Sequence, residues 1–236
     1  ISPKNGRLMS NIAIITGASS GIGAATAARF ISLGHQTINI SRRPCPVDDV
    51  INISADLATT SGAEAAASAA LEYLADGPMT CLVHNASLML KDTVDSCVDD
   101  DLERVMRVNV SAINTLNRYL LPAMGKQSSL LYVGSTLSEK AVAGAFSYVI
   151  SKHAQLGMMR ASCQDLAGTG IHTAMVCPGF TETEMLKQHL GGDASLMHEI
   201  GSQNGFGRLV DPDEIAAALV WAQANPVING SVIHAN

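Results

Sequence analysis

Short apolar runs alternate along the chain with longer segments in which apolar residues recur at helical spacing. The short runs carry Ile, Val and Leu at consecutive positions, which is typical of strands that are buried on both faces of a sheet. The predicted strands cover residues 11–16, 36–41, 49–55, 79–85, 128–135, 171–179 and 230–236. The predicted helices cover residues 21–34, 62–76, 99–124, 147–168 and 211–224.

This regular alternation predicts the fold class α/β: a single-domain, Rossmann-like, doubly wound parallel sheet of about seven strands with helices on both faces. The chain shows no internal repeat, no low-complexity linker and no break in composition, so we expect one domain over residues 9–236. Met9 looks like a natural start, and residues 1–8 are therefore expected to be a tag remnant or a disordered tail. Only residues 42–49 connect the second and third strands, so a loop or a single turn is expected there instead of a crossover helix.

Composition narrows the classes of function. Of the 236 residues, 47% are hydrophobic and 15% are charged, and the net charge is −6. This acidic balance without a basic stretch argues against nucleic acid as a partner, and no apolar run approaches the ~20 residues of a membrane span. The five cysteines form no CxxC pair and the seven histidines form no HxH or HExxH motif. We therefore expect reduced thiols, a cytoplasmic protein and no metal site.

The sequence TGASSGIG at residues 16–23 joins the first predicted strand to the first predicted helix. Gly17 permits a sharp turn, Gly21 lets the backbone approach a pyrophosphate, and Gly23 lets the helix pack close to the sheet. The helix N-terminus offers free N–H groups and positive potential to phosphate. We therefore predict a dinucleotide site at this turn, with further contacts from Ser19, Ser20 and Ile22.

The spacing T-G-x-x-x-G-x-G, which starts at Thr16, resembles the signature of the short-chain dehydrogenase/reductase family. The resemblance covers essentially the whole chain from about Met9 onward. The segments PGFTETEM and GRLVDPDEI are similar to the β-ketoacyl reductase branch of that family. The resemblance implies a nicotinamide cofactor and a reaction at a carbonyl or alcohol group.

In this family, the end of the second strand selects the cofactor, and an acid there favours NAD. Here the strand ends with Ser41, Arg42 and Arg43 and has no acid, so the resemblance implies NADP(H) in preference to NAD(H). Two guanidinium groups suit a 2′-phosphate because they are always charged and donate in a fork. Solvated arginines on a short loop are the alternative.

Other family motifs imply further cofactor contacts. Asp56 and Leu57 match the pair that reaches the adenine, and Asn85 and Ala86 match the centre of the family's N-N-A-G motif. His84 and Ser87 depart from that motif, and we expect a structural role for His84. The segment PGFTET implies contacts to the nicotinamide end from Pro178, Gly179, Thr181 and Thr183.

The candidate catalytic group centres on Tyr148 and Lys152, which stand one turn apart on one predicted helix. Ser135 ends the preceding strand, at the sheet edge where ligands bind. The resemblance implies that Tyr148 gives or takes a proton, that Ser135 bonds the substrate oxygen, and that Lys152 holds the nicotinamide ribose. It also implies that Asn109 holds a water that links Lys152 to solvent. The Lys152 cation and the positive nicotinamide together are expected to lower the pKa of Tyr148.

The substrate is less well defined by the sequence. Residues 184–206 are predicted to form an apolar lid with a hinge at residues 191–192, and the pocket is expected to include Met185, Leu186, Leu190, Leu196, Met197, the segment 88–90, Leu137, Val142 and Phe146. We expect a small apolar ketone or secondary alcohol. A carrier-bound β-ketoacyl substrate is disfavoured because the segments 125–129 and 167–170 offer only Lys126 as a basic group. Two alternative functions stay open: a diol dehydrogenase, and an inactive NADP-sensing or scaffold protein. We expect the protein to form a homotetramer or a dimer.

Overall fold

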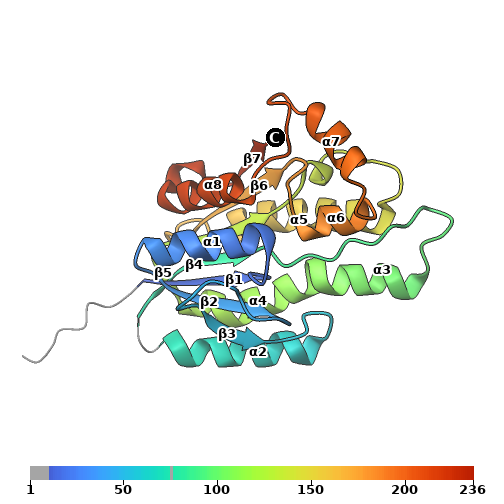
Figure 1. Ribbon diagram of the computed structural model, residues 1–236. Helices are drawn as coiled ribbons and strands as arrows, with labels where there is room; N and C mark the ends of the chain where they lie inside the picture. Colours follow the sequence, from blue (N-terminus) through green and yellow to red (C-terminus); the bar gives the residue numbers. More distant parts are fainter. Residues whose placement is uncertain (1–10, 75–76) are drawn as a thin grey trace, which may run out of the picture.

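The computed structural model describes residues 11–74 and 77–236 (Figure 1). The predicted tail at residues 1–8 and the end of the helix predicted to reach residue 76 lie outside the described residues. The strands are β1 (Ile12–Thr16), β2 (Gln36–Ser41), β3 (Ile51–Ser54), β4 (Met79–His84), β5 (Met124–Val133), β6 (His172–Pro178) and β7 (Ser231–Ala235). The α-helices are α1 (Gly21–Ser32), α2 (Thr60–Tyr73), α3 (Asp99–Met106), α4 (Ala112–Leu120), α5 (Phe146–Asp165), α6 (Glu184–His189), α7 (Ala194–Ser202) and α8 (Pro212–Ala224).

The strands form one seven-stranded sheet in the order β3-β2-β1-β4-β5-β6-β7, and every neighbouring pair is parallel. The strand order reverses between β1 and β4, which is the switch point of a doubly wound fold. The predicted Rossmann-like parallel sheet is therefore confirmed. Residues 42–50 connect β2 to β3 without a helix, as their length predicts.

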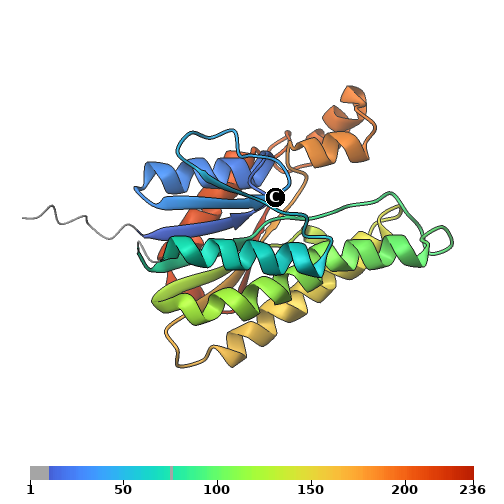
Figure 2. The same ribbon diagram turned by 90° about the horizontal axis from the view of Figure 1, so that it is seen from below.

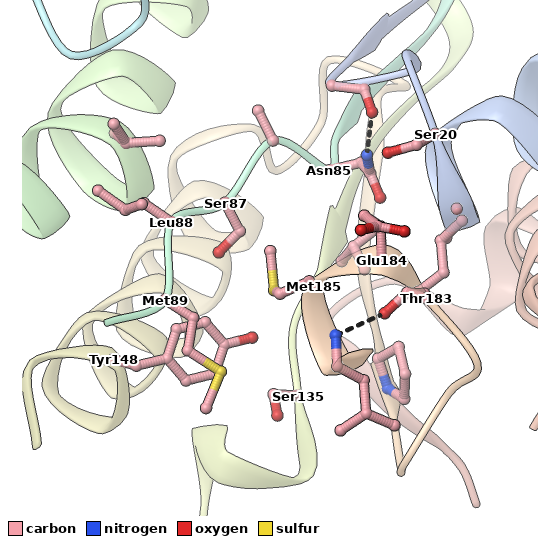
Figure 3. Close-up of a pocket in the computed structure, with 18 of the residues that line it drawn as sticks. Ser20, Asn85, Ser87, Leu88, Met89, Ser135, Tyr148, Thr183, Glu184 and Met185 are labelled. Carbon is pink, nitrogen blue, oxygen red and sulfur yellow. Dashed lines mark hydrogen bonds between the residues drawn. The ribbon is translucent and has the colours of Figure 1, made fainter. Parts of the chain in front are cut away.

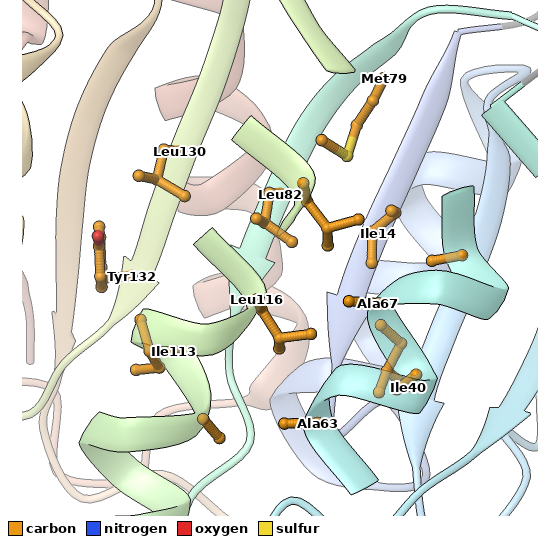
Figure 4. Packing of buried hydrophobic residues seen from close by; sticks show 14 of the residues in the cluster. Ile14, Ile40, Ala63, Ala67, Met79, Leu82, Ile113, Leu116, Leu130 and Tyr132 are labelled. Atoms are coloured by element: carbon orange, nitrogen blue, oxygen red, sulfur yellow. The ribbon is translucent and has the colours of Figure 1, made fainter. Parts of the chain in front are cut away.

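Helices cover both faces of the sheet (Figures 1 and 2). Side chains alternate along each strand, so that Ile12 and Ile14 face one core while Ala13 and Ile15 face the other. Helices α2, α4 and α5 pack on the first face through small and branched side chains, and Figure 4 shows part of this cluster. Helices α1 and α8 pack side by side on the second face. Burial on both faces explains why the strands read as continuous apolar runs.

The structure differs from the prediction around residues 99–124. The single predicted helix is divided, because α3 and α4 are joined by a π-helical turn, η2 (Arg107–Ser111). A 3₁₀ turn, η3 (Leu121–Ala123), then ends the helical segment, and β5 begins at Met124, four residues before the predicted start at 128. The pairing register of β5 with β4 shifts near this early start. Apolar periodicity does not report a π turn, because one inserted residue leaves the flanking helical spacing intact.

The carboxyl ends of the strands meet at one edge of the sheet, and the loops at this edge frame the candidate site. Helices α6 and α7 lie beyond this edge and are joined through Gly191 and Gly192, both of which have positive φ. Within residues 11–74 and 77–236, no helix combines the length and apolar character needed to cross a membrane.

Candidate active site

A cavity of about 460 Å³ opens at the carboxyl edge of the sheet. It collects nearly all of the residues that the sequence assigns to cofactor and catalysis, although they come from separate loops. The predicted residues that line it are Gly17, Ser19, Ser20, Gly21, Ile22, Ser41, Arg42, Arg43, Asp56, Leu57, Asn85, Ala86, Ser135, Tyr148, Lys152, Pro178, Gly179, Thr181 and Thr183. Gly23 and Asn109 are the two predicted site residues outside this lining.

The glycine turn is closely packed against the end of β4. Gly17 has a φ of +72°, and a Cβ atom there would lie 2.8 Å from Ala86 Cα. A Cβ atom on Gly23 would lie 2.4 Å from Gly17 O, so Gly23 acts behind the cavity by allowing this contact. Gly17 is therefore required both for its backbone conformation and for close approach, and Gly23 is required for close approach.

Asn85 fastens this turn to β4. Its Nδ2 donates to Thr16 O and Gly17 O, each at 3.0 Å, and its backbone N–H donates to Thr16 Oγ1 at 3.0 Å. Figure 3 draws one of the two bonds from Nδ2 as a dashed line. On the other side, Asn39 Oδ1 in β2 accepts from Ala18 N at 2.9 Å. The side chains of Asn85 and Asn39 thus each bond backbone groups of the turn and hold it between β4 and β2.

The loop after β2 places two cations at one end of the cavity. Arg42 and Arg43 are exposed, and neither forms an ion pair within the described residues. The loop itself is fixed, because Asn52 Oδ1 accepts from Cys45 N at 2.7 Å and from Asn39 Nδ2 at 2.9 Å. Asp56 lies nearby and accepts from Ala58 N. The cavity lining thus brings together Arg42, Arg43 and Asp56, for which the family resemblance implies contacts to the adenosine.

Tyr148 lies in the first turn of α5, and the residue is 7% exposed at the cavity. Ser135 follows β5, and its Oγ also accepts from Leu137 N as the cap of a short 3₁₀ turn. Ser87 Oγ is buried without a close hydrogen-bond partner among the described residues, and it points toward the Tyr148 hydroxyl (Figure 3). Burial raises the pKa of Tyr148 to about 12, while the Ser135 and Ser87 hydroxyls oppose this rise.

Lys152 is one of the largest fully buried side chains of the protein, at 1% exposed. Its Nζ donates to Val133 O at 2.9 Å and to Gln155 Oε1 at 3.0 Å, and lies 5.4 Å from the centre of the Tyr148 ring. Burial lowers the pKa of Lys152 to about 7, against a smaller opposing effect of Cys177. In the protein without cofactor, desolvation therefore dominates the pKa of Tyr148, and the expected lowering by Lys152 and the bound nicotinamide together stays a prediction.

Asn109 lies in the π turn and is fully buried. Its Oδ1 accepts from Leu88 N at 2.7 Å, and its Nδ2 donates to Leu88 O at 2.9 Å and to Ser151 Oγ at 2.8 Å. Its backbone oxygen accepts from Gln155 Nε2 at 2.6 Å. The side chain of Gln155 therefore joins Lys152 to Asn109 directly.

His84, at the end of β4, is 2% exposed and bonds Asn117 Oδ1 through Nε2 at 2.7 Å. Burial lowers the pKa of His84 to about 4, although the bond to Asn117 opposes this. The ring is therefore neutral near pH 7, and it lies against Tyr132 in the core. These contacts fit the structural role that the sequence predicts for His84.

Apolar side chains from two segments line the cavity beside Tyr148, together with the polar α6 residues Glu184, Gln188 and His189. Helix α6 contributes Met185 and Leu186, and the loop after β4 contributes Leu88 and Met89 (Figure 3). Leu137 and Val142 also line the cavity, as expected. The other expected lining residues, Leu90, Phe146, Leu190, Leu196 and Met197, do not line it. The apolar cover is therefore smaller than predicted and comes from α6 and not from α7.

Sequence reasoning missed three polar residues that organise this site: Asn39, Ser87 and Gln155. Ser87 was visible only as a departure from the family motif, without a function. Asn39 and Gln155 lie at polar positions inside otherwise apolar elements, which is the signal that could have identified them. Among the described residues, no group of three or more His, Cys, Asp or Glu side chains is arranged to hold a metal ion.

The glycine turn and the Tyr148–Lys152 pair open onto one cavity at the switch point of the sheet, which is the arrangement of a dinucleotide-dependent oxidoreductase. The sequence profile of the family described as short chain dehydrogenase matches residues 11–192. The chain belongs to this family, and it is an oxidoreductase that acts on CH–OH or C=O groups. The family uses a nicotinamide cofactor.

Relatives agree with this assignment. The chain is 33% identical over 199 residues to a 2-(R)-hydroxypropyl-CoM dehydrogenase from Xanthobacter autotrophicus, which covers 77% of this chain and 79% of the relative. It is 28% identical to a 3-oxoacyl-(acyl-carrier-protein) reductase from Vibrio harveyi over 97% of both chains. A short chain dehydrogenase from Burkholderia cenocepacia, solved in complex with NADP, superimposes with a TM-score of 0.84 at 26% identity, over 98% of both chains. The predicted likeness to the β-ketoacyl reductase branch is confirmed.

Proposed function

We propose that the protein is an NADP(H)-dependent oxidoreductase that reversibly transfers a hydride between nicotinamide and a small apolar ketone or secondary alcohol. The observation that carries this proposal is the position of Tyr148, whose hydroxyl faces the cavity between Ser135 and Ser87 and one turn from Lys152. Burial keeps this hydroxyl protonated near neutral pH, as a proton donor to a carbonyl must be.

The cavity fits a dinucleotide because its glycine turn is shaped for close backbone approach. Gly17 and Gly21 both have positive φ, and a side chain on Gly17 would collide with Ala86. The N-terminus of α1 directs N–H groups toward the place of the pyrophosphate. When bound, the nicotinamide supplies or accepts the hydride.

The cofactor preference follows from charge at the adenosine end. Arg42 and Arg43 have no ion-pair partner within residues 11–74 and 77–236 and stand beside the cavity. A 2′-phosphate offers these guanidinium groups a doubly charged acceptor, which the ribose hydroxyl of NAD lacks. The NADP found in the Burkholderia relative supports the same preference for this chain.

Residues of the protein place the substrate, transfer the proton and stabilise the phenolate. Ser135 Oγ hydrogen-bonds the substrate oxygen and places it near the Tyr148 hydroxyl. Tyr148 gives its proton to that oxygen in reduction and takes it back in oxidation. Ser87 Oγ donates to the phenolate that forms, because no other acceptor is close to it. Lys152 stabilises the same phenolate by its charge and reaches toward the cofactor ribose.

The substrate is proposed to be small because Leu88, Met89, Met185 and Leu186 close the end of the cavity around the hydroxyl groups. Residues 184–206 are proposed to act as a lid that hinges at Gly191 and Gly192. A β-ketoacyl thioester is the second candidate, and the similarity to the Vibrio reductase favours it. Homotetrameric assembly and a cytoplasmic location remain predictions, and light scattering tests the first.

A fluorescence titration with NADPH, followed by a panel of small ketones and β-ketoacyl thioesters, tests this function. Loss of nicotinamide absorbance with a small ketone is the expected result. Binding of NADPH without turnover of any panel member would favour an NADP sensor instead. Turnover that occurs only with NADH would contradict the cofactor assignment.

A further inference from the structure

A buried chain of polar groups extends from the active-site lysine into the protein interior. Lys152 Nζ donates to Gln155 Oε1 at 3.0 Å, and Gln155 Nε2 donates to the backbone oxygen of Asn109 at 2.6 Å. Lys152 and Gln155 are each 1% exposed, and Asn109 is fully buried. An amide that joins a buried cation to a buried carbonyl has a defined orientation, because its oxygen must face the cation and its NH₂ group the carbonyl.

Three elements of the fold contribute to this series of buried polar groups. Gln155 and Lys152 lie three residues apart on one face of α5, so their side chains meet above the same turn. Asn109 belongs to the π turn η2, in which Ala112 N–H reaches back to Arg107 O. β5 contributes Val133 O, the second acceptor of Lys152 Nζ, at 2.9 Å. One donor of the ammonium group therefore remains for the cavity, which Lys152 also lines.

The charge of Lys152 depends on few neighbours. The titratable groups near Lys152 are Tyr148, on the same helix, and Cys177, on β6. Burial and the nearby Glu139 both raise the pKa of the Cys177 thiol. β5 and η2 offer only the backbone oxygens of Val133 and Asn109. No carboxylate is hydrogen-bonded to Lys152 Nζ in the described chain, so neutral oxygen atoms alone stabilise the buried ammonium.

We propose that Gln155 is a positioning residue for the reaction. Anchored on the π-helical turn, its side chain holds the Lys152 ammonium toward the cavity and keeps it charged. This proposal rests on the proposed function for its catalytic meaning, because Lys152 acts there on the phenolate of Tyr148. The predicted effect of Gln155 on the charge of Lys152 does not depend on whether the protein turns over a substrate. Removal of the amide oxygen takes away one of two acceptors and makes the charged form of Lys152 less stable.

The test titrates Lys152 directly by NMR in cofactor-free protein labelled with ¹³C at the lysine ε position. The signal that disappears in Lys152→Arg identifies the residue. In Gln155→Met, which keeps side-chain length without hydrogen bonds, the Lys152 midpoint should fall by about one pH unit, as expected for the loss of one hydrogen bond to a charged group. An unchanged midpoint in a folded Gln155→Met protein would overturn the proposal.

Gln155→Glu provides an opposite shift in a side chain of the same shape. A carboxylate beside the ammonium favours its charged form, so the Lys152 midpoint should rise by one pH unit or more. This variant decides the question if Gln155→Met does not fold, and a midpoint that stays in place or falls would contradict the proposal.

Ser162→Ala is the matched control, because Ser162 lies on the same helix and bonds the buried Tyr132 hydroxyl at 3.1 Å without contacting the active site. It should lower thermal stability while it leaves the Lys152 midpoint unchanged.

In carbonyl reduction with NADPH, the pH above which the rate of Gln155→Met declines should move by the same amount as the midpoint. If the unsubstituted protein reduces no carbonyl, the proposed function fails, while the NMR titration still decides the role of Gln155.

Discussion

Replacement of Gly17 by alanine tests whether the glycine turn is built for close backbone approach. The added Cβ atom would lie 2.8 Å from Ala86 Cα and 3.1 Å from both Ala86 N and Asn85 Nδ2, and the residue would keep a φ of +72°. Carbon atoms in contact prefer separations of about 3.5–4.0 Å, so the turn or the segment after β4 must move by about 1 Å.

Two costs follow from this geometry. A left-handed conformation costs alanine about 1–2 kcal/mol, and the forced displacement of a well-packed segment costs about 1–3 kcal/mol. We therefore expect Gly17→Ala to lower the free energy of unfolding by about 2–5 kcal/mol in the absence of cofactor. The displaced N–H groups should also weaken NADPH binding by about tenfold or more, since one hydrogen bond to a charged group is worth about 1.5–3 kcal/mol.

Gly34 provides the control. Its φ is +80°, but a Cβ atom there would meet no heavy atom within 4 Å, and the residue lies just after α1, away from the cavity. Gly34→Ala should lose only about 1–2 kcal/mol for the backbone conformation and should bind NADPH as tightly as the unsubstituted protein. Urea unfolding and fluorescence titration measure the two quantities. Equal stability losses and equal NADPH affinities in the two variants would refute the close-approach argument.

Two further substitutions test the charges and hydroxyl groups of the cavity. Replacing Arg42 and Arg43 together by alanine should raise the KM for NADPH by about tenfold or more through the loss of charged hydrogen bonds, while the KM for NADH should stay nearly constant; an equal change for both cofactors would count against a 2′-phosphate site. Ser87→Gly removes a donor to the Tyr148 phenolate and so raises the pKa of Tyr148. The rise of alcohol oxidation with pH should then move upward by about one pH unit, and oxidation with an unshifted pH profile would exclude this role.

The sequence predicted the parts of the fold that depend on local pattern. Consecutive Ile, Val and Leu residues identified the strands, because both faces of a parallel sheet are buried. The glycine spacing located the turn correctly because close backbone approach admits no larger residue at Gly17. The π turn at residues 107–111 and the early start of β5 at Met124 were missed, since neither changes the apolar periodicity.

In the candidate site, too, residues with a local sequence pattern were predicted, and residues that depend on long-range contacts were not. Tyr148, Lys152 and Ser135 were predicted from spacing, and they line one cavity. The role of Gln155 depends on contact with Asn109, which is 46 residues away in the sequence, so no local pattern could report it. The upward shift of the Tyr148 pKa in the cofactor-free protein could not be predicted from spacing, because desolvation depends on how deeply the finished fold buries a side chain.

The most direct test of the account measures carbonyl reduction by a Tyr148→Phe variant with NADPH. Phenylalanine keeps the ring but removes the hydroxyl that donates the proton, and general acid catalysis contributes about 100-fold or more. The account predicts a fall in kcat of at least about this size, with NADPH affinity and thermal stability close to those of the unsubstituted protein. Reduction at near-full rate by Tyr148→Phe would contradict the central claim.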